Sequence, residues 1–231
     1  MDFNHDNIPD VLSGSYPGEL YLFPGKSDGT FDASQTINTA NNQPLKAGMA
    51  AAPFAFDWDN DGKLDLIIGD IEGNVFFVRN EGTAEKPVYK QPTAGSFLFG
   101  RAKPNTGARI TAAGKEVKVE SDAGPTVADW NSDGTPDLIV GSGDGSVTLF
   151  LAQGREKSGA PVLTAAVTLL PASNQDGDNK TPWGIRTKPF VTDWNHDGHP
   201  DLLVGDFQNN NTGYHGYVWL FLGKPPASAS R

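Results

Sequence analysis

Residues 57–69 read DWDNDGKLDLIIG, and the same thirteen-residue pattern occurs three more times in the 231-residue chain. The other copies are DFNHDNIPDVLSG at 2–14, DWNSDGTPDLIVG at 129–141 and DWNHDGHPDLLVG at 193–205. Successive copies begin 55, 72 and 64 residues apart, which is the period of a unit of about four strands. Chance does not produce such a pattern four times, so the chain is predicted to be built from internal repeats.

Each copy ends in a strand-like run, and a short turn leads from it into a second one at 19–23, 74–78, 146–151 and 217–222. A third β segment is expected at 30–37, 87–91 and 161–169, and a fourth, leading into the next copy, at 52–58, 125–130 and 189–194. No stretch longer than about ten residues keeps a helical period free of Gly and Pro. The predicted fold is all-β: a propeller of four blades over residues 1–223, either complete or part of a larger ring, followed by a flexible tail or linker at 224–231.

The strand inventory is incomplete at both ends. The first unit has no strand before its acidic loop, and the last unit has no good strand after residue 222. Unpaired strand edges recruit other chains. We therefore expect these edges to pair with other blades or with other subunits.

The acidic loops carry the clearest chemistry. They place side-chain oxygens at positions 1, 3, 5 and 9 and a backbone carbonyl at position 7, a set that can surround one Ca²⁺ ion. Position 6 needs a positive φ, and it is Gly in three copies and Asn7 in the first. An EF-hand would need Glu at position 12, where this chain has Ser or an aliphatic residue. The predicted ligands are Asp2, Asn4, Asp6, Ile8 and Asp10; Asp57, Asp59, Asp61, Lys63 and Asp65; Asp129, Asn131, Asp133, Thr135 and Asp137; and Asp193, Asn195, Asp197, His199 and Asp201.

The charge balance agrees with cation binding. The formal net charge is −10, and thirteen of the 28 acidic residues lie in the four loops, where they repel one another unless a cation is bound. Up to four Ca²⁺ ions would bring the net charge to −2. The alternative is that the loops are solvated Asx turns without metal. The acidic excess disfavours nucleic acid and anionic membranes as partners, and no apolar run is long enough to span a bilayer.

These residues resemble the FG-GAP/VCBS repeat family, whose sequences carry a DxDxDGxxD loop followed by a D-L-[IL]-[IV]-G strand. The resemblance runs from Asp2 to about Leu222 and implies a calcium-stabilised β-propeller. Asn7 in place of Gly, the missing strands at both ends and the small number of repeats depart from the family pattern. The motif is specific for a fold and does not name a ligand.

A ligand is expected on the face opposite the acidic loops. The turn after the fourth motif is expanded to eleven residues, 206–216, and is rich in amide and aromatic side chains that suit sugars. The candidate ligand-binding residues are Trp183, Arg186, Asn210, Tyr214 and His215. The alternative is a solvated loop with Trp183 packed against the next blade.

The favoured function is a non-enzymatic binding or adhesion module for glycan or protein, on an exported bacterial protein that is extracellular, periplasmic or on the cell surface. Residues 1–6 do not read as a signal peptide. One alternative is a propeller fragment of a polysaccharide lyase or other carbohydrate-active enzyme, with Tyr214 or His215 as base and Arg186 neutralising a uronate. Another is a structural subunit of a larger assembly. No known catalytic signature is present, so no catalytic residue is assigned.

Overall fold

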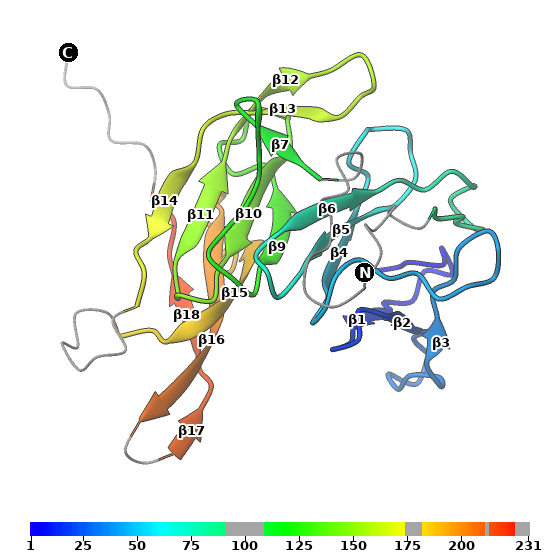
Figure 1. Cartoon of the computed structure of the whole chain (residues 1–231), viewed down its shortest axis with the longest axis horizontal. Coiled ribbons are helices and arrows are strands. Elements are labelled where there is room, and N and C mark those ends of the chain that lie inside the picture. The colour runs from blue at the N-terminus through cyan, green and yellow to red at the C-terminus, as the bar shows by residue number, and fades with distance from the viewer. Residues whose placement is uncertain (91–108, 174–181, 211–212, 225–231) are drawn as a thin grey trace, which may run out of the picture.

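The computed structural model describes residues 1–90, 109–173, 182–210 and 213–224, with only the backbone described at 209–210 (Figure 1). These residues form strands, turns and bends and contain no helix, so the predicted all-β class is confirmed. Within the described ranges, nothing resembles a helix long and apolar enough to cross a membrane. The predicted tail lies outside them, apart from Lys224.

The four repeats form four antiparallel sheets. The first contains β1 (Val11–Gly14), β2 (Leu20–Phe23) and β3 (Gln35–Thr36), and the second contains β4 (Ala52–Phe56), β5 (Asp65–Gly69) and β6 (Val75–Val78). The third contains β9 (Gly124–Ala128), β10 (Asp137–Gly141), β11 (Val147–Phe150) and β14 (Val167–Leu170). The fourth contains β15 (Ile185–Thr192), β16 (Asp201–Asn210), β17 (Gly213–His215) and β18 (Val218–Phe221).

Most predicted strands are found, and three details differ. Over the described part of 87–91 there is no strand, and Tyr89 forms only isolated bridges, with Asn80 and Thr39. The segment 161–169 divides between two sheets: β14 completes the third repeat, whereas β13 (Pro161–Leu163) joins β7 (Thr111–Ala112), β8 (Lys115–Glu116) and β12 (Ala152–Arg155) in a small sheet that the repeat pattern did not predict. The insertion at 206–216 is a hairpin, because β16 runs on to pair with β17.

The motif strands of the second and third sheets lie in the middle of the molecule, because neighbouring sheets cover both of their faces. All five residues of β5 and all five of β10 are buried. A strand covered on both faces gains from apolar side chains at successive positions, which explains the unbroken run Leu66, Ile67, Ile68. In the second and third units the repeat thus places its acidic loop immediately before the most deeply buried strand.

The sheets stand in a row, each packed on the next. One apolar core lies between the first and second sheets, another between the second and third, and another between the third and fourth. The closest approaches run from β1 to β4, from β4 to β9 and from β9 to β15. Figure 1 shows that this row is curved: the first sheet, in blue, lies at the lower right and the fourth, in orange, at the lower left, with the second and third above them. This arrangement puts the four acidic loops at corresponding ends of their sheets.

Candidate metal centres

The first Asp of each acidic loop holds the loop closed. In the second loop, Asp57 Oδ1 accepts the N–H of Asp61 and Asp57 Oδ2 accepts the N–H of Gly62, both at 3.0 Å. Asp2, Asp129 and Asp193 accept the same two N–H groups of their own loops at 2.9 to 3.0 Å. The repeated sequence therefore gives one repeated loop geometry.

Two residues in every loop have positive φ. The prediction for position 6 is confirmed, with φ of 67° at Asn7 and 82° to 86° at the three glycines. Position 4 is also left-handed, with φ of 59° to 60°, although its side chain is not Gly in any copy. These residues are His5, Asn60, Ser132 and His196. The sequence offered no signal for this second turn, because the residue types at position 4 vary.

Positions 3 and 5 face each other across three of the loops. In the third loop, Asn131 Nδ2 donates to Asp133 Oδ2 at 2.8 Å, and Asn131 Oδ1 accepts the N–H of Asp133 at 3.1 Å. The pairs Asn4–Asp6 and Asn195–Asp197 repeat both contacts. The position-5 carboxylates of all four loops also accept the N–H of position 7, which completes the repeated hydrogen bonding of the loops.

The second loop differs because Asp59 replaces Asn at position 3. Carboxylate oxygens of Asp57, Asp59 and Asp61 lie within 4.8 Å of one another. Asp59 is buried, and its Oδ1 atom has no hydrogen-bond partner among the described residues. Burial, and then the neighbouring charge of Asp61, raise the pKa of Asp59. A buried oxygen that lacks a donor and sits among other carboxylates is the chemistry that a divalent cation satisfies.

Two basic side chains compensate part of this charge. Arg79 Nε lies 2.7 Å from Asp59 Oδ2, and Arg79 Nη2 lies 3.0 Å from Asp61 Oδ2. Lys63 Nζ lies 2.9 Å from Asp61 Oδ2. Sequence reasoning missed Arg79, although a signal existed: the corresponding positions in the other units are Pro24, Leu151 and Leu222. The loop with the most carboxylates is thus the loop that also has an internal guanidinium.

The Asp at position 9 joins the loop to the end of the strand that pairs with the motif strand. Asp137 Oδ2 accepts the N–H of Trp130 at 2.9 Å, and Asp137 Oδ1 accepts the N–H of Ala152 at 2.7 Å. Asp10, Asp65 and Asp201 make the same pair of bonds. All four are buried, and burial raises the pKa of Asp65 to about 6. Metal coordination by these carboxylates, and by the position-7 carbonyls, stays a prediction.

The candidate ligand-binding residues lie on and beside the β16–β17 hairpin, at the opposite end of the fourth sheet from its acidic loop. The guanidinium of Arg186 lies over the Phe207 ring, 5.7 Å from its centroid, and Phe207 stacks on Tyr214 at 5.7 Å. Tyr214 is 75% exposed. The structure therefore brings Arg186 and Tyr214 together around Phe207, a residue that the sequence reasoning did not select.

The other candidates lie apart from this group. Trp183 is half-buried and makes an edge-to-face contact with Phe221, at 5.7 Å between ring centroids. His215 is tilted against Tyr217 at 6.2 Å. The backbone of Asn210 pairs with that of Gly213. The packing of Trp183 matches the alternative in which this residue seals the neighbouring sheet.

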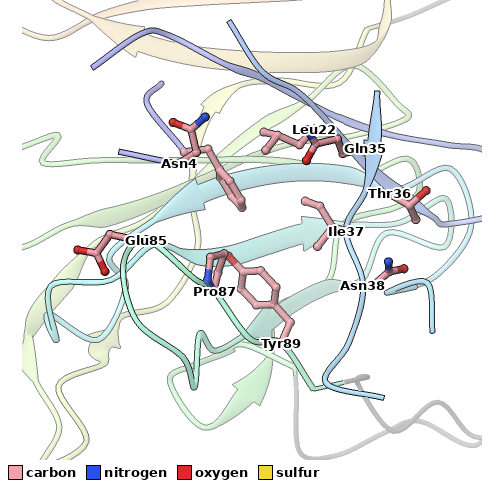
Figure 2. A pocket seen from close by; sticks show the side chains of 10 residues that line it. Asn4, Leu22, Gln35, Thr36, Ile37, Asn38, Glu85, Pro87 and Tyr89 are labelled. Atoms are coloured by element: carbon pink, nitrogen blue, oxygen red, sulfur yellow. The ribbon is translucent and has the colours of Figure 1, made fainter. Parts of the chain in front are cut away.

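A pocket of about 240 Å³ lies beside the first acidic loop (Figure 2). Its floor includes Ile37 and Tyr89, whose ring points into the space in Figure 2 and whose hydroxyl donates to Leu64 O at 3.1 Å. Polar groups such as Asn4 and Glu85 stand at its rim. No charged side chain among its lining residues is buried. We therefore interpret the pocket as a gap between packed segments of the chain.

The comparison with protein families supports the internal repeat found in the sequence. A family profile described as FG-GAP-like repeat matches residues 2–68 and 129–204, more than half of the chain. No curated protein matches. Among solved structures, the chain is similar to an Agrocybe aegerita lectin described as recognising non-reducing terminal N-acetylglucosamine, with 16% identity and a TM-score of 0.33. That alignment covers 94% of this chain and 64% of the lectin chain. The profile match, on the loops and strands described above, shows that this chain belongs to the FG-GAP-like repeat family.

Proposed function

We propose that the chain is a calcium-stabilised binding module with propeller architecture, in which each acidic loop holds one Ca²⁺ ion and the β16–β17 hairpin binds a glycan. The carrying observation is the loop geometry: in all four loops the Asp at position 1 accepts the N–H groups of positions 5 and 6. In the second loop, oxygens of three carboxylates also lie within 4.8 Å of one another, and Asp59 Oδ1 is buried with no hydrogen-bond partner among the described residues. In this proposal the four sheets are blades, either of a small propeller or of a larger ring. Such modules act outside the cytoplasm, where calcium is millimolar.

The residues of the loops fit a hard cation. Carboxylates at positions 1 and 5 and a carboxylate or amide oxygen at position 3 would hold it, and these are the donors that Ca²⁺ prefers. The bound ion would neutralise carboxylates that otherwise repel one another across a few ångströms. The protein itself supplies the rest of the closure, because the first Asp and the position-9 Asp bond the loop backbone.

Calcium is therefore expected to raise the thermal stability. A ligand that binds only the folded state adds about 2.7 kcal/mol at a concentration 100 times its Kd. For a chain of this size we expect the melting temperature to fall by roughly 5 to 10 °C in EDTA for each site so filled. Differential scanning calorimetry in calcium, in magnesium and in EDTA measures this fall, and calorimetric titration gives the number of sites.

Matched variants separate site binding from general charge effects. Asp133→Ala removes a position-5 ligand of the third loop, whereas Asp28→Ala removes an exposed Asp that bonds only Thr30. We expect Asp133→Ala to lower the calcium stoichiometry by one and Asp28→Ala to leave it unchanged. Identical melting curves in calcium and EDTA, with no heat of calcium binding, would contradict the proposal.

The glycan half of the proposal rests on the exposed aromatic group of the hairpin. Tyr214 offers an open ring face beside Phe207, and Arg186 adds donors for hydroxyl or carboxylate groups. A glycan array probed with the calcium-loaded protein, followed by titration of any ligand found, is the test. Tyr214→Ala should abolish that binding, whereas Tyr16→Ala, which removes a ring that is 65% exposed in the first unit, should not. Binding to proteins alone would overturn the glycan assignment and leave the calcium sites standing.

A further inference from the structure

The interfaces between neighbouring sheets use the same positions of the repeat. Between the third and fourth sheets, Ile139, Val147 and Leu149 of the third pack against Leu202 and Val204 of the fourth. The matching sets in the other interfaces are Leu20 and Leu22 against Leu66 and Ile68, and Ile67 and Val75 against Leu138 and Val140. Each sheet therefore has one face built to meet the sheet after it and an opposite face built to meet the sheet before it.

The fourth sheet has nothing on its following face among the described residues. Val218 and Leu220 are 71% and 42% exposed, whereas Val147 and Leu149, at the same positions of the third sheet, are 0% and 3% exposed. Trp194 is 58% exposed, although the aromatic residues at its position in the first two units are buried. We call this the end face, and it consists of Phe190, Trp194, Leu203, Val218 and Leu220.

The last glycine of the motif shows the same difference between the fourth unit and the units before it. A Cβ atom on Gly69 or Gly141 would lie 2.2 or 2.1 Å from a backbone oxygen of the following unit, so these positions are Gly because the next sheet comes so close. On Gly205 the nearest atom would be 3.8 Å away, and it belongs to Lys188 of the same sheet. The fourth unit thus keeps the glycine that close packing requires, while the structure shows open space there.

In the described part of the chain, nothing covers the preceding face of the first sheet. Val11 is 43% exposed, whereas Leu66, at the same position of the second sheet, is fully buried. Ser13, Tyr21 and Phe23 share this face with Val11 and are half-buried. We call these four residues the start face. The end face and the start face do not meet within the chain, because the sheets form a row with the first and fourth at its ends (Figure 1).

We infer that the end face of one chain docks on the start face of a second copy. The reason is continuity with the internal interfaces, in which a following face always meets a preceding face and never one of its own kind. Among the described residues each chain has one uncovered face of each kind, so two copies related by a two-fold axis would cover both faces of both chains. A single such contact without closure would instead grow an open chain.

The apolar side chains of the end face favour its burial against a second copy. Burying apolar surface contributes about 25 cal/mol per Å², and the end face combines two large aromatic rings with three aliphatic side chains. The net charge of −10 on each chain opposes association. The pair should therefore tighten when salt screens the charge. This inference stands on the sheet packing and needs neither calcium nor glycan binding to be correct.

The test is the mass of the full chain in solution, measured by light scattering or sedimentation over a wide range of concentration. We expect a species of twice the 24.6-kDa chain mass that dissociates on dilution. A monomer at every concentration would overturn the inference, and a mass that grows without limit would overturn the closed two-fold pair.

Charge substitutions distinguish the proposed geometry from others. Val218→Glu on the end face and Val11→Glu on the start face should each weaken association by about tenfold or more, because each buries a charge in the contact. Val162→Glu is the control, since Val162 is 43% exposed on β13, away from both faces.

Mixing the two face variants restores one intact contact, so the mixture should associate more strongly than either variant alone. If Val11→Glu leaves the dimer intact while Val218→Glu abolishes it, two end faces meet each other and the inference is wrong. Circular dichroism melting curves show whether each variant is folded.

Discussion

Arg79 is the residue at which the second loop departs from the other three. Its guanidinium contacts Asp59 and Asp61, two of the proposed calcium ligands, so calcium must bind against a cation that the chain supplies itself. The contact is half-exposed, and ion pairs of this kind are worth about 0.2 to 1 kcal/mol. The cost of displacing Arg79 is therefore modest but measurable.

We predict that Arg79→Met strengthens calcium binding at the second loop by up to about fivefold, the factor that corresponds to about 1 kcal/mol. The same variant should be less stable than the wild type in EDTA, because Asp59 loses its internal partner. Calorimetric titration and urea unfolding measure the two effects. Lys26→Met, which removes a pairing with Asp32 outside the loops, is the control and should change neither. Weaker calcium binding in Arg79→Met would mean that the guanidinium orients the ligands and does not compete.

At the scale of the elements, the turn after β5 holds a buried Asp and the turn after β10 a half-buried one, and their pKa shifts are opposite. Burial raises the pKa of Asp70, and the charge of Glu72 adds to that effect. Burial also acts to raise the pKa of Asp144, but hydrogen bonds from the hydroxyl and N–H of Ser146 outweigh it, so the pKa of Asp144 is lowered. The two hairpins should therefore respond to pH in opposite directions.

A raised pKa means that the folded state binds the proton more tightly than the unfolded chain. The contribution of Asp70 to stability is thus present below the unfolded pKa of 3.8 and is lost as the pH rises through the folded pKa. For Asp144 the sign is reversed, and its contribution is lost as the pH falls through its lowered pKa. These statements concern the difference between wild type and a variant that cannot titrate.

We predict that the stability of the wild type relative to Asp70→Asn falls as the pH rises above about 4, while its stability relative to Asp144→Asn falls as the pH drops below about 4. Urea unfolding in calcium-free buffer at successive pH values gives both difference curves. Each variant serves as the control for the other, because Asp70 and Asp144 lie in corresponding turns of two neighbouring sheets. Difference curves of the same sign would contradict the assignment.

The elements also show what the sequence could predict. The motif strands, the strands that follow them and the left-handed residue at position 6 could be read directly, because each depends on a local pattern of apolar residues or Gly. The hydrogen bond that the N–H of Ala152 donates to Asp137 could not be predicted, because it depends on where β11 ends relative to the loop. The small sheet of β7, β8, β12 and β13 joins segments from different units and has no local signature. The hairpin at β17 was hidden because its sequence is rich in Asn and Gly, which favour turns.

At the scale of the whole molecule, the described residues form a row of sheets in which the inner two are covered on both faces and the outer two on one. Strands β5 and β10 are buried at every residue, whereas β18 exposes alternate residues and β1 exposes Val11. Stability against local opening follows the amount of buried apolar contact. The ends of the row should therefore open more readily than its middle.

We predict that amide hydrogen exchange is slowest in β5 and β10 and faster in β1 and β18 when the protein is dilute. If a second copy covers the end face, protection of β18 and β1 should rise together with concentration, while that of β5 stays constant. Hydrogen exchange followed by mass spectrometry at several concentrations resolves these segments, and the Val218→Glu variant should remove the concentration dependence. Protection of β18 equal to that of β10 at the lowest concentration would show that the end face is covered within one chain, which would contradict the open row and the docking inferred from it.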